Sequence, residues 1–224
     1  MHDARIVSLV PSATETLLAL GADVVACTRF CEQPGLLHVG GTKNPDVGAI
    51  VALAPDLVVV DEEENRREDA AALAAAGIEL LVLAVRSVED AVAAVDELAH
   101  RAGRPAPGLC VPPTVPVQGR AFVPIWRRPW MTINADTYGA SVLRAVGLEL
   151  VTASAPDRYP TVELADVASM APDVVLVPSE PYSFTETHLD ELRAAFPDAT
   201  VVPVDGQDLF WWGTRTPAAI DRLR

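Results

Sequence analysis

The stretch AIVALAPDLVVVDEE, from Ala49 to Glu63, recurs in altered form as DVASMAPDVVLVPSE, from Asp166 to Glu180. In each copy an Ala-Pro-Asp step interrupts a helical pattern, and proline disfavours helical geometry in the residue before it. A short apolar run follows, Leu57 to Val60 in the first copy and Val174 to Val177 in the second. Such runs are typical of strands buried on both faces of a parallel sheet. The repeat therefore predicts an α/β protein with two similar lobes.

Two further pairs of segments support this duplication. TETLLALGADVVACT, from Thr14, matches YGASVLRAVGLELVTAS, from Tyr138, and in both a glycine ends a helix before a short aliphatic strand. The helix and strand expected within residues 68–83 match those expected within 188–204. Each lobe is expected to hold a small, mainly parallel sheet flanked by helices. Because α/β proteins bind ligands at the carboxyl ends of their strands, a ligand cleft is expected between the lobes.

The expected domains are an N-terminal lobe over residues 1–85, a connector over 86–119 and a C-terminal lobe over 120–224. Apolar residues at helical spacing predict a helix over 87–102 at the start of the connector. The segment GRPAPGLCVPPTVPVQG, from Gly103 to Gly119, has five prolines and no periodicity. It is expected to be an extended, semi-rigid linker.

Charge and hydropathy exclude several classes of partner. The chain has 224 residues, of which 31 are acidic and 17 basic, and its formal net charge is −14. This argues against nucleic acid and anionic membranes, because both are bound through basic patches. No apolar run approaches the roughly 20 residues of a membrane helix. The start lacks a basic segment followed by an apolar one, so no signal peptide is expected. The protein is then cytoplasmic as it stands, or extracytoplasmic if a leader was removed.

The three cysteines, Cys27, Cys31 and Cys110, are too few for a disulfide framework. Cys27 and Cys31 could form a metal or redox pair, but their C-x3-C spacing matches no standard zinc pattern. Two reduced loop thiols are the favoured interpretation.

No catalytic motif is present: the sequence lacks the signatures of a nucleophile elbow, a phosphate loop, a zinc-binding helix and a dinucleotide fold. We therefore expect no catalytic residues and no metal ligands. The acidic run Glu62 to Glu64 could bind a cation or a ligand, although a solvated first helical turn is the favoured interpretation. An enzyme that uses Glu62 to Glu64, or Glu180, is kept as the less favoured alternative.

Aromatic residues are few and fall mostly in expected loops. These loop aromatics are Phe30, Trp126, Trp130, Tyr159, Tyr182, Phe184, Phe210, Trp211 and Trp212. Large aromatics in loops suit a cleft that holds a large, partly apolar ligand. The alternative is that they fasten irregular loops onto small cores.

Several segments carry a family resemblance. They are RIVSLVPSATETLLALGA, CTRFCEQP, VGGTKNP, RRPWMTINADTYGASVLRAVG, YPTVELADVASMAPDVVLVPSEPY and WWGTR. Together they resemble the cobalamin-binding, helical-backbone group of ABC-transporter solute-binding proteins, the class III type of periplasmic binding protein. The resemblance covers nearly the whole chain outside 103–119. It implies two α/β lobes joined by a helix, with the ligand held between them.

The resemblance also implies the ligand-binding residues. In the first lobe they are Phe30, Thr42, Lys43, Asn44, Glu62, Glu64 and Asn65. In the second lobe and the terminal loop they are Trp126, Trp130, Tyr159, Trp211 and Arg215. Tyr182 is added because it follows the second Pro-Asp strand. Aromatic faces suit a corrin ring, while Lys43, Asn44 and Arg215 can hydrogen-bond amides or a phosphate.

The sequence thus predicts a non-enzymatic solute-binding protein for a corrinoid such as cobalamin. No cofactor is required, since the corrinoid is the bound ligand. An iron-siderophore, haem or metal ligand on the same fold is the alternative. The expected partners are the small-molecule ligand and an ABC-transporter permease, and the chain is expected to be a monomer.

Overall fold

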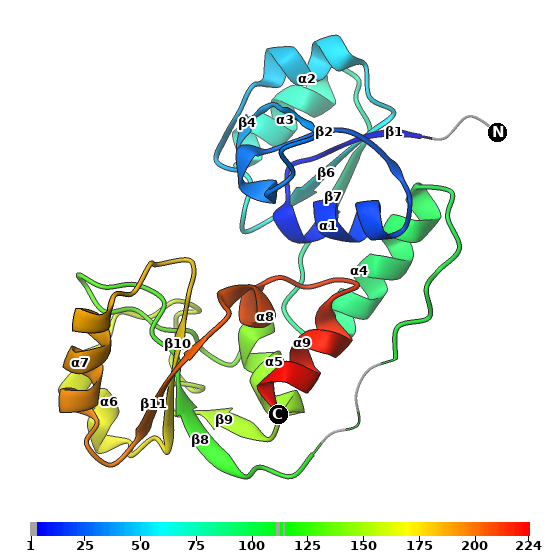
Figure 1. Cartoon of the computed structure of the whole chain (residues 1–224). Helices are drawn as coiled ribbons and strands as arrows, with labels where there is room; N and C mark the ends of the chain where they lie inside the picture. The colour runs from blue at the N-terminus through cyan, green and yellow to red at the C-terminus, as the bar shows by residue number, and fades with distance from the viewer. Residues whose placement is uncertain (1–3, 111–112, 114) are drawn as a thin grey trace. The chain divides into compact units, whose positions relative to one another are not determined.

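The computed structural model describes residues 4–110, 113 and 115–224. They group into two compact units. The first unit comprises Met1–Val85, Glu89–Cys110 and Trp212–Arg215, and the second comprises Arg86–Val88, Val111–Trp211 and Thr216–Arg224. Each unit is described by itself, because the position of one relative to the other is not determined (Figure 1). The cleft expected between two lobes therefore stays a prediction.

The first unit is built on a five-stranded parallel sheet in the order β3-β2-β1-β6-β7. Its strands are β1 (Arg5–Ser8), β2 (Asp23–Cys27), β3 (Leu37–His38), β6 (Leu57–Asp61) and β7 (Leu80–Leu83). Its helices are α1 (Pro11–Ala19), the 3-10 turn η1 (Arg29–Cys31), α2 (Val47–Leu53), α3 (Arg67–Ala75) and α4 (Val88–Arg101). A short antiparallel hairpin, β4 (Gly40–Gly41) with β5 (Asn44–Pro45), lies between β3 and α2.

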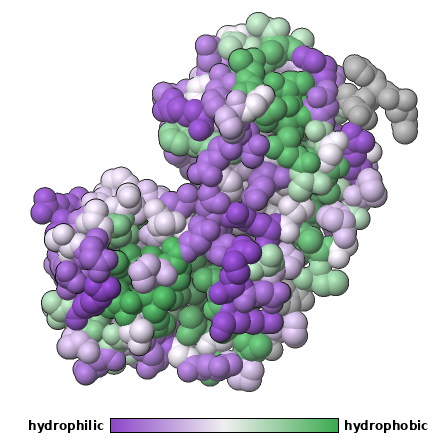
Figure 2. All heavy atoms as spheres, in the orientation of Figure 1, coloured by the Kyte–Doolittle hydropathy of each residue, from purple (hydrophilic) through white to green (hydrophobic). Residues whose placement is uncertain are grey.

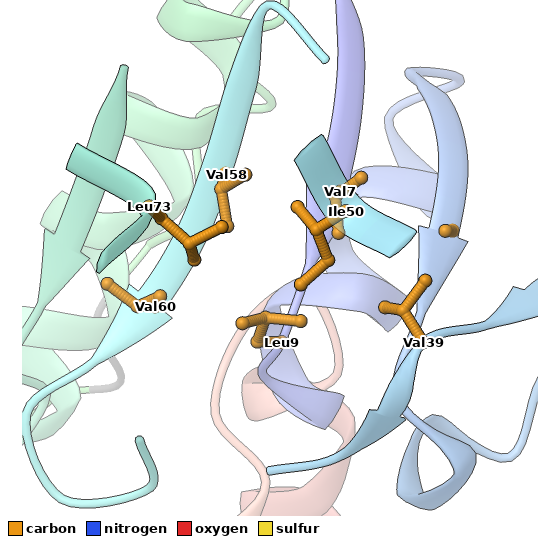
Figure 3. Close-up of a cluster of buried hydrophobic side chains, with 8 residues drawn as sticks. Val7, Leu9, Val39, Ile50, Val58, Val60 and Leu73 are labelled. Carbon is orange, nitrogen blue, oxygen red and sulfur yellow. The ribbon is translucent and has the colours of Figure 1, made fainter. Parts of the chain in front are cut away.

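The core of this unit follows from the alternation of side chains along its strands. Val7 of β1 and Val58 of β6 point to one face, where Ile50 of α2 and Leu73 of α3 cover them (Figure 3). The intervening residues point to the other face, on which α1 lies (Figure 1). Both faces of the central strands are thus buried, as the apolar run over Leu57 to Val60 predicts.

The second unit holds a four-stranded parallel sheet in the order β11-β10-β8-β9. Its strands are β8 (Gly119–Phe122), β9 (Leu148–Leu150), β10 (Val174–Pro178) and β11 (Thr200–Val204). Its helices are α5 (Tyr138–Ala145), α6 (Leu164–Ser169), α7 (Glu186–Ala195), α8 (Gly206–Phe210) and α9 (Thr216–Leu223). Phe122 of β8 is fully buried against Phe196, which follows α7, with ring centroids 5.4 Å apart. Val175 of β10 and Leu192 of α7 complete this core.

The predicted duplication is confirmed by the strand order. The series β2-β1-β6-β7 in the first sheet has the same order along the chain as β9-β8-β10-β11 in the second, and β3 is an addition to the first. The two Pro-Asp strands, β6 and β10, occupy equivalent positions. The fold class predicted from the sequence, two α/β units each with a small parallel sheet, is correct.

The helix expected over 87–102 is α4, which is grouped with the first unit apart from its first residue. In the Pro-rich segment, residues 104–110, 113 and 115–118 form neither helix nor strand. Val111, Pro112 and Thr114 of the expected linker lie outside the described residues. The division into lobe, connector and lobe stays a prediction.

The Ala-Pro-Asp step has the same structural role in both units. Ala54 and Ala171, which precede the prolines, have left-handed φ values of 46° and 50°. Asp56 then accepts a hydrogen bond on Oδ2 from the backbone N–H of Arg5 at 2.8 Å, and its own N–H donates to the Arg5 carbonyl at 2.9 Å. These two hydrogen bonds fix the start of β1 beside the start of β6.

The second unit repeats this arrangement. The backbone N–H of Arg120 donates to Asp173 Oδ2 at 2.7 Å, and the Asp173 N–H donates to the Arg120 carbonyl at 2.8 Å. The Arg120 guanidinium donates to the carbonyl of Met170, as that of Arg5 does to the carbonyl of Leu53. The aspartate of each motif is therefore a strand clamp.

We expect Asp56→Ala and Asp173→Ala each to lower the free energy of unfolding by about 1 kcal/mol, since each loses a hydrogen bond to a backbone donor. Urea denaturation followed by circular dichroism measures the change. Asp198→Ala, at an exposed turn position, is the control. Equal stability of all three variants would show that the clamp contributes nothing.

The surface mixes hydrophilic and hydrophobic residues (Figure 2). Hydrophilic residues cover much of the face drawn in Figure 2, and hydrophobic residues form separate patches between them. Within the described part of the chain, no helix combines the length and apolar character that crossing a membrane requires.

Candidate functional site

The first group of predicted site residues lies beyond the carboxyl ends of β2 and β6. Phe30, in the middle of η1, is 50% exposed although it is a large aromatic. The Arg29 guanidinium lies over its ring, 4.7 Å from the centroid. A Cβ at Gly41 of the β4–β5 hairpin would lie 3.0 Å from Phe30 Cε2, so the missing side chain lets ring and hairpin meet. Phe30 is thereby held beside the Thr42–Asn44 turn.

Asn65 ties this hairpin to the turn after β6. Its side-chain amide donates to the carbonyls of Thr42 at 3.0 Å and Leu9 at 3.2 Å. Its Oδ1 accepts from the backbone N–H of Asp61 at 2.8 Å. Asn65 is buried, so its amide holds together the loops that follow three different strands.

Most of the first-lobe residues predicted for the site therefore come together. Lys43 donates from Nζ to the carbonyl of Glu63, which brings the hairpin turn to the acidic run. Glu62 is exposed and Glu64 half-buried. The loops after β2 and β6 and the hairpin turn thus form one rim, which combines an aromatic face, an ammonium group, an amide and carboxylates.

Asp61, the last residue of β6, is a buried carboxylate beneath this rim. Burial raises its pKa, although its Oδ1 accepts hydrogen bonds from the backbone N–H groups of Glu63 at 2.8 Å and Glu64 at 3.4 Å. Nearby negative charge on Glu63 and Glu62 acts in the same direction as burial. Its contacts make Asp61 a residue that shapes the turn.

Asp61→Asn tests whether the pKa of Asp61 is raised by burial. Because the pKa of Asp61 is raised in the folded state, the folded protein still binds a proton at pH values where the unfolded chain has lost it. Binding of this proton stabilises the folded state, and the stabilisation is lost as the pH rises through the raised pKa. The asparagine keeps an oxygen acceptor without the buried charge. We expect its stability relative to the unmodified protein to be more favourable at pH 7 than at pH 4, measured by urea denaturation. A difference that does not change with pH would contradict the assignment.

The second group is a cluster of aromatic rings in the second unit, next to the carboxyl end of β10. The Trp126 and Tyr182 rings meet edge to face with centroids 5.2 Å apart. Tyr182 also contacts Phe184 at 4.8 Å, and Trp130 stacks on Phe184 at 6.0 Å with an interplanar angle of 6°. The ring of His188, in the first turn of α7, lies 5.7 Å from Tyr182. We call these five residues the aromatic cluster.

Two features hold the aromatic cluster in place. A β-bridge between Trp126 and Met131 folds the intervening segment back on itself. Arg127, in that segment, packs over the Trp130 ring 5.7 Å from its centroid and pairs with Glu191 of α7 at 2.7 Å. The rings are thus anchored while Trp126 keeps 44% of its surface exposed.

His188 gives the cluster a polar edge. Its Nδ1 accepts a hydrogen bond from the backbone N–H of Thr185 at 3.0 Å, which caps α7. In the neutral ring the proton then sits on Nε2, so this atom is a donor. Sequence reasoning did not assign Phe184 or His188 to the site. Phe184 is one of the loop aromatics, whereas no sequence pattern distinguishes His188.

The remaining predicted residues lie elsewhere. Tyr159 is 41% exposed in the loop before α6, and Trp211 directly follows α8 as its C-cap residue. Arg215, predicted for the terminal loop, lies in the segment between α8 and α9, and this segment is grouped with the first unit. Its Nε lies 3.0 Å from Oε2 of Glu15 on α1.

The fold is shared with periplasmic solute-binding proteins. A possible iron-binding (periplasmic solute-binding) protein from Staphylococcus epidermidis has a TM-score of 0.80 at 19% identity, covering all of this chain and 98% of that one. The predicted resemblance to the class III solute-binding proteins is confirmed. No family model matches the chain.

Some of the proteins to which the chain is similar are vitamin B12-binding proteins. The chain is similar to the vitamin B12-binding protein of Yersinia pestis (strain Pestoides F), at 25% identity over 232 residues, covering 95% of this chain and 81% of the relative. The periplasmic vitamin B12-binding protein BtuF of Vibrio cholerae has a TM-score of 0.79 at 19% identity, covering 99% and 95% of the two chains. The periplasmic heme-binding protein BhuT, in complex with two hemes, also has a TM-score of 0.79, at 21% identity, and covers 99% and 97%.

Proposed function

We propose that this protein is a non-enzymatic solute-binding protein whose ligand is a corrinoid such as cobalamin. The observation that carries the proposal is the aromatic cluster, in which Trp126, Trp130 and Tyr182 converge from two loops far apart in sequence. Exposed, anchored rings bind flat or bulky apolar surfaces at low entropic cost. The names of the vitamin B12-binding relatives support this choice of ligand.

The first unit contributes a surface of different chemistry. Phe30 offers an exposed ring face, and Thr42, Lys43 and Asn44 offer hydroxyl, ammonium and amide groups. These suit the amide side chains at the edge of a corrin ring, with Glu62 and Glu64 accepting from amide N–H groups. We assign Asn65 to positioning the turn, since its amide already serves three backbone groups. Tyr159, Trp211 and Arg215 remain proposed ligand contacts.

The test is a titration of purified protein with cyanocobalamin and with dicyanocobinamide. Isothermal calorimetry measures the affinity, and the visible spectrum reports a change at the corrin. We expect one corrinoid per chain with a dissociation constant in the micromolar range or tighter. Absence of binding by both corrinoids at high micromolar concentration would overturn the proposal.

A haem, iron-siderophore or metal ligand is the second candidate, favoured by several heme-binding proteins that have a similar fold. Competition separates the candidates: haemin and a ferric siderophore are added to the cobalamin complex. We expect cobalamin to stay bound. Displacement by an equimolar competitor would transfer the assignment to that ligand.

We propose that the solute leaves the protein chemically unchanged. The alternative based on Glu62 to Glu64 requires a reaction, so mass spectrometry of the ligand recovered after long incubation distinguishes binding from catalysis. Among the described residues, no group of three or more His, Cys, Asp and Glu side chains could hold a metal ion for such chemistry.

Partner and location follow as further proposals. The similar structures include a periplasmic binding protein and an ABC-transporter substrate-binding protein. They favour a protein that works outside the cytoplasmic membrane and delivers its ligand to an ABC-transporter permease. Cell fractionation tests the location, and co-purification tests the permease. We propose a monomer, which light scattering of the purified protein checks.

A further inference from the structure

His188, in the first turn of α7, is held by ring contacts and by a hydrogen bond. Its ring centroid lies 5.7 Å from that of Tyr182, and it meets the Phe184 ring edge to face, with centroids 6.0 Å apart and an interplanar angle of 89°. Its Nδ1 accepts a hydrogen bond from the backbone N–H of Thr185 at 3.0 Å. These contacts fix both the position and the rotation of the imidazole within the aromatic cluster.

The second ring nitrogen of His188, Nε2, is a hydrogen-bond donor. A backbone N–H can only donate, so Nδ1 carries no proton and the neutral ring carries it on Nε2. No group in the described part of the chain pairs with Nε2. The ring is half-buried, but Nε2 is not one of the buried polar atoms that lack a partner, so it reaches solvent. The aromatic cluster thus presents an N–H group of fixed direction at its surface.

The surroundings of this donor favour a neutral acceptor over an anion. The other polar atoms of the aromatic cluster belong to the indole N–H groups of Trp126 and Trp130 and the hydroxyl of Tyr182, and none of these groups supplies a positive charge. Arg127, which packs on the Trp130 ring, is paired with Glu191 at 2.7 Å. The α7 helix carries three acidic residues and one arginine. A carbonyl oxygen therefore suits this donor, since an anion would face the excess of carboxylates on α7.

We propose that the Nε2–H of His188 donates a hydrogen bond to an amide carbonyl of the bound corrinoid and so determines ligand specificity; this inference rests on the proposed function. Neutral amide side chains surround a corrin ring, so a corrin face packed on Trp126 brings amide carbonyls to the edge of the aromatic cluster. Haem carries carboxylates instead, which would face the acidic residues of α7. A protonated Nε2 has no lone pair for a metal ion, so His188 does not ligate cobalt or iron.

Three substitutions separate the roles of the His188 side chain. Glutamine at this third helical position can accept the N-cap N–H, as in a capping box, and can still donate an N–H. Glutamate keeps the acceptor alone, and phenylalanine keeps the ring alone. We expect His188→Gln to bind cyanocobalamin within about twofold of the unmodified protein, and His188→Glu and His188→Phe to bind it about fivefold more weakly, the effect of one lost hydrogen bond. Isothermal calorimetry measures the affinities.

Thr185→Val is the control for the helix cap. The Thr185 hydroxyl takes part in the capping box of α7 and lies 3.3 Å from Nδ1 of His188, so this variant loses part of the cap and keeps the imidazole. We expect a lower thermal midpoint and an unchanged affinity. A loss of affinity equal to that of His188→Phe would attribute the effect to the start of α7 and overturn the donor role. Unchanged affinity in both His188→Phe and His188→Glu, or an equal loss in His188→Gln, would overturn it as well.

A second ligand tests which acceptor His188 contacts. Dicyanocobinamide keeps the amide side chains of the corrin ring but lacks the phosphate and the nucleotide base of cyanocobalamin. We expect His188→Phe to weaken the binding of both corrinoids by the same factor, because the acceptor is an amide carbonyl that both contain. A loss confined to cyanocobalamin would place the acceptor in the nucleotide portion and overturn the assignment to an amide.

The visible spectrum of bound aquocobalamin tests whether His188 ligates the metal. We expect the same spectrum with the unmodified protein and with His188→Phe, since a donor N–H leaves the cobalt ligands unchanged. A spectrum that differs between the two would show coordination by the imidazole and overturn the proposal. Binding of corrinoids by the unmodified protein and by His188→Phe with equal affinity would overturn the role of His188 and leave the proposed function standing. No corrinoid binding by the unmodified protein would overturn both.

Discussion

Trp126→Ala is expected to weaken cobalamin binding about 30-fold, which corresponds to the roughly 2 kcal/mol that a central aromatic contributes to an interface. Trp126 is 44% exposed and touches the ring of Tyr182. Its removal takes away contact area for the ligand and an edge that holds its neighbour. Tyr182→Ala is expected to have a similar effect. Calorimetric titration of each variant gives the affinities.

The double variant should lose less than the product of the two single losses, because residues in contact are not energetically independent. Met170→Ala is the control: this residue is also an exposed hydrophobic of the second unit, and its removal should leave affinity unchanged. The thermal midpoints should stay close to that of the unmodified protein. Unchanged affinity in both single variants would remove the aromatic cluster from the binding site.

Gly213→Ala is expected to lower the free energy of unfolding by about 3 kcal/mol, because backbone strain and overpacking act together there. Gly213 has φ +125°, and a Cβ on it would lie 2.0 Å from Oγ1 of Thr16 on α1. The same Oγ1 accepts a hydrogen bond from the backbone N–H of Thr214 at 3.3 Å. A methyl group would lift this segment from α1. Urea denaturation measures the loss.

Gly35→Ala is the matched control, since a Cβ at Gly35 would meet nothing within 4 Å. This variant should be neutral or slightly stabilising, because alanine restricts the unfolded chain. Thr16→Ala combined with Gly213→Ala should recover part of the loss by removing the colliding oxygen, while the unfavourable φ remains. If Gly213→Ala and Gly35→Ala have the same stability, the segment does not dock on α1 as described.

Local patterns were sufficient to predict the α/β class and the doubled unit. Pro55 and Pro172 end their helices through a steric effect on the preceding residue, and Ala54 and Ala171 adopt the left-handed conformation at those ends. The apolar runs after them are the central strands. What the aspartates do could not be read in the same way, because their partners Arg5 and Arg120 lie 51 and 53 residues away.

The candidate site could be predicted where a distinctive residue type, a large aromatic, falls in an expected loop. The large aromatics in loops predicted Trp126, Trp130 and Tyr182, and in the structure Trp126 contacts Tyr182 while Trp130 joins them through Phe184. His188 was missed because a histidine in the first turn of a helix has no distinctive pattern. The pairing of Arg215 with Glu15 could not be predicted, since it joins residues near opposite ends of the chain.

The Ala-Pro-Asp repeat and the apolar runs that follow it determined, from sequence alone, that the chain folds as two similar α/β units. These features act between residues that are close in sequence: proline excludes the helical conformation of the residue before it, and an uninterrupted apolar run marks a strand buried on both faces. Tertiary structure alone decided that Asn65 ties the loops of three strands and that five rings form one cluster. Each of these depends on hydrogen bonds or ring contacts between segments that only the folded sheet brings together.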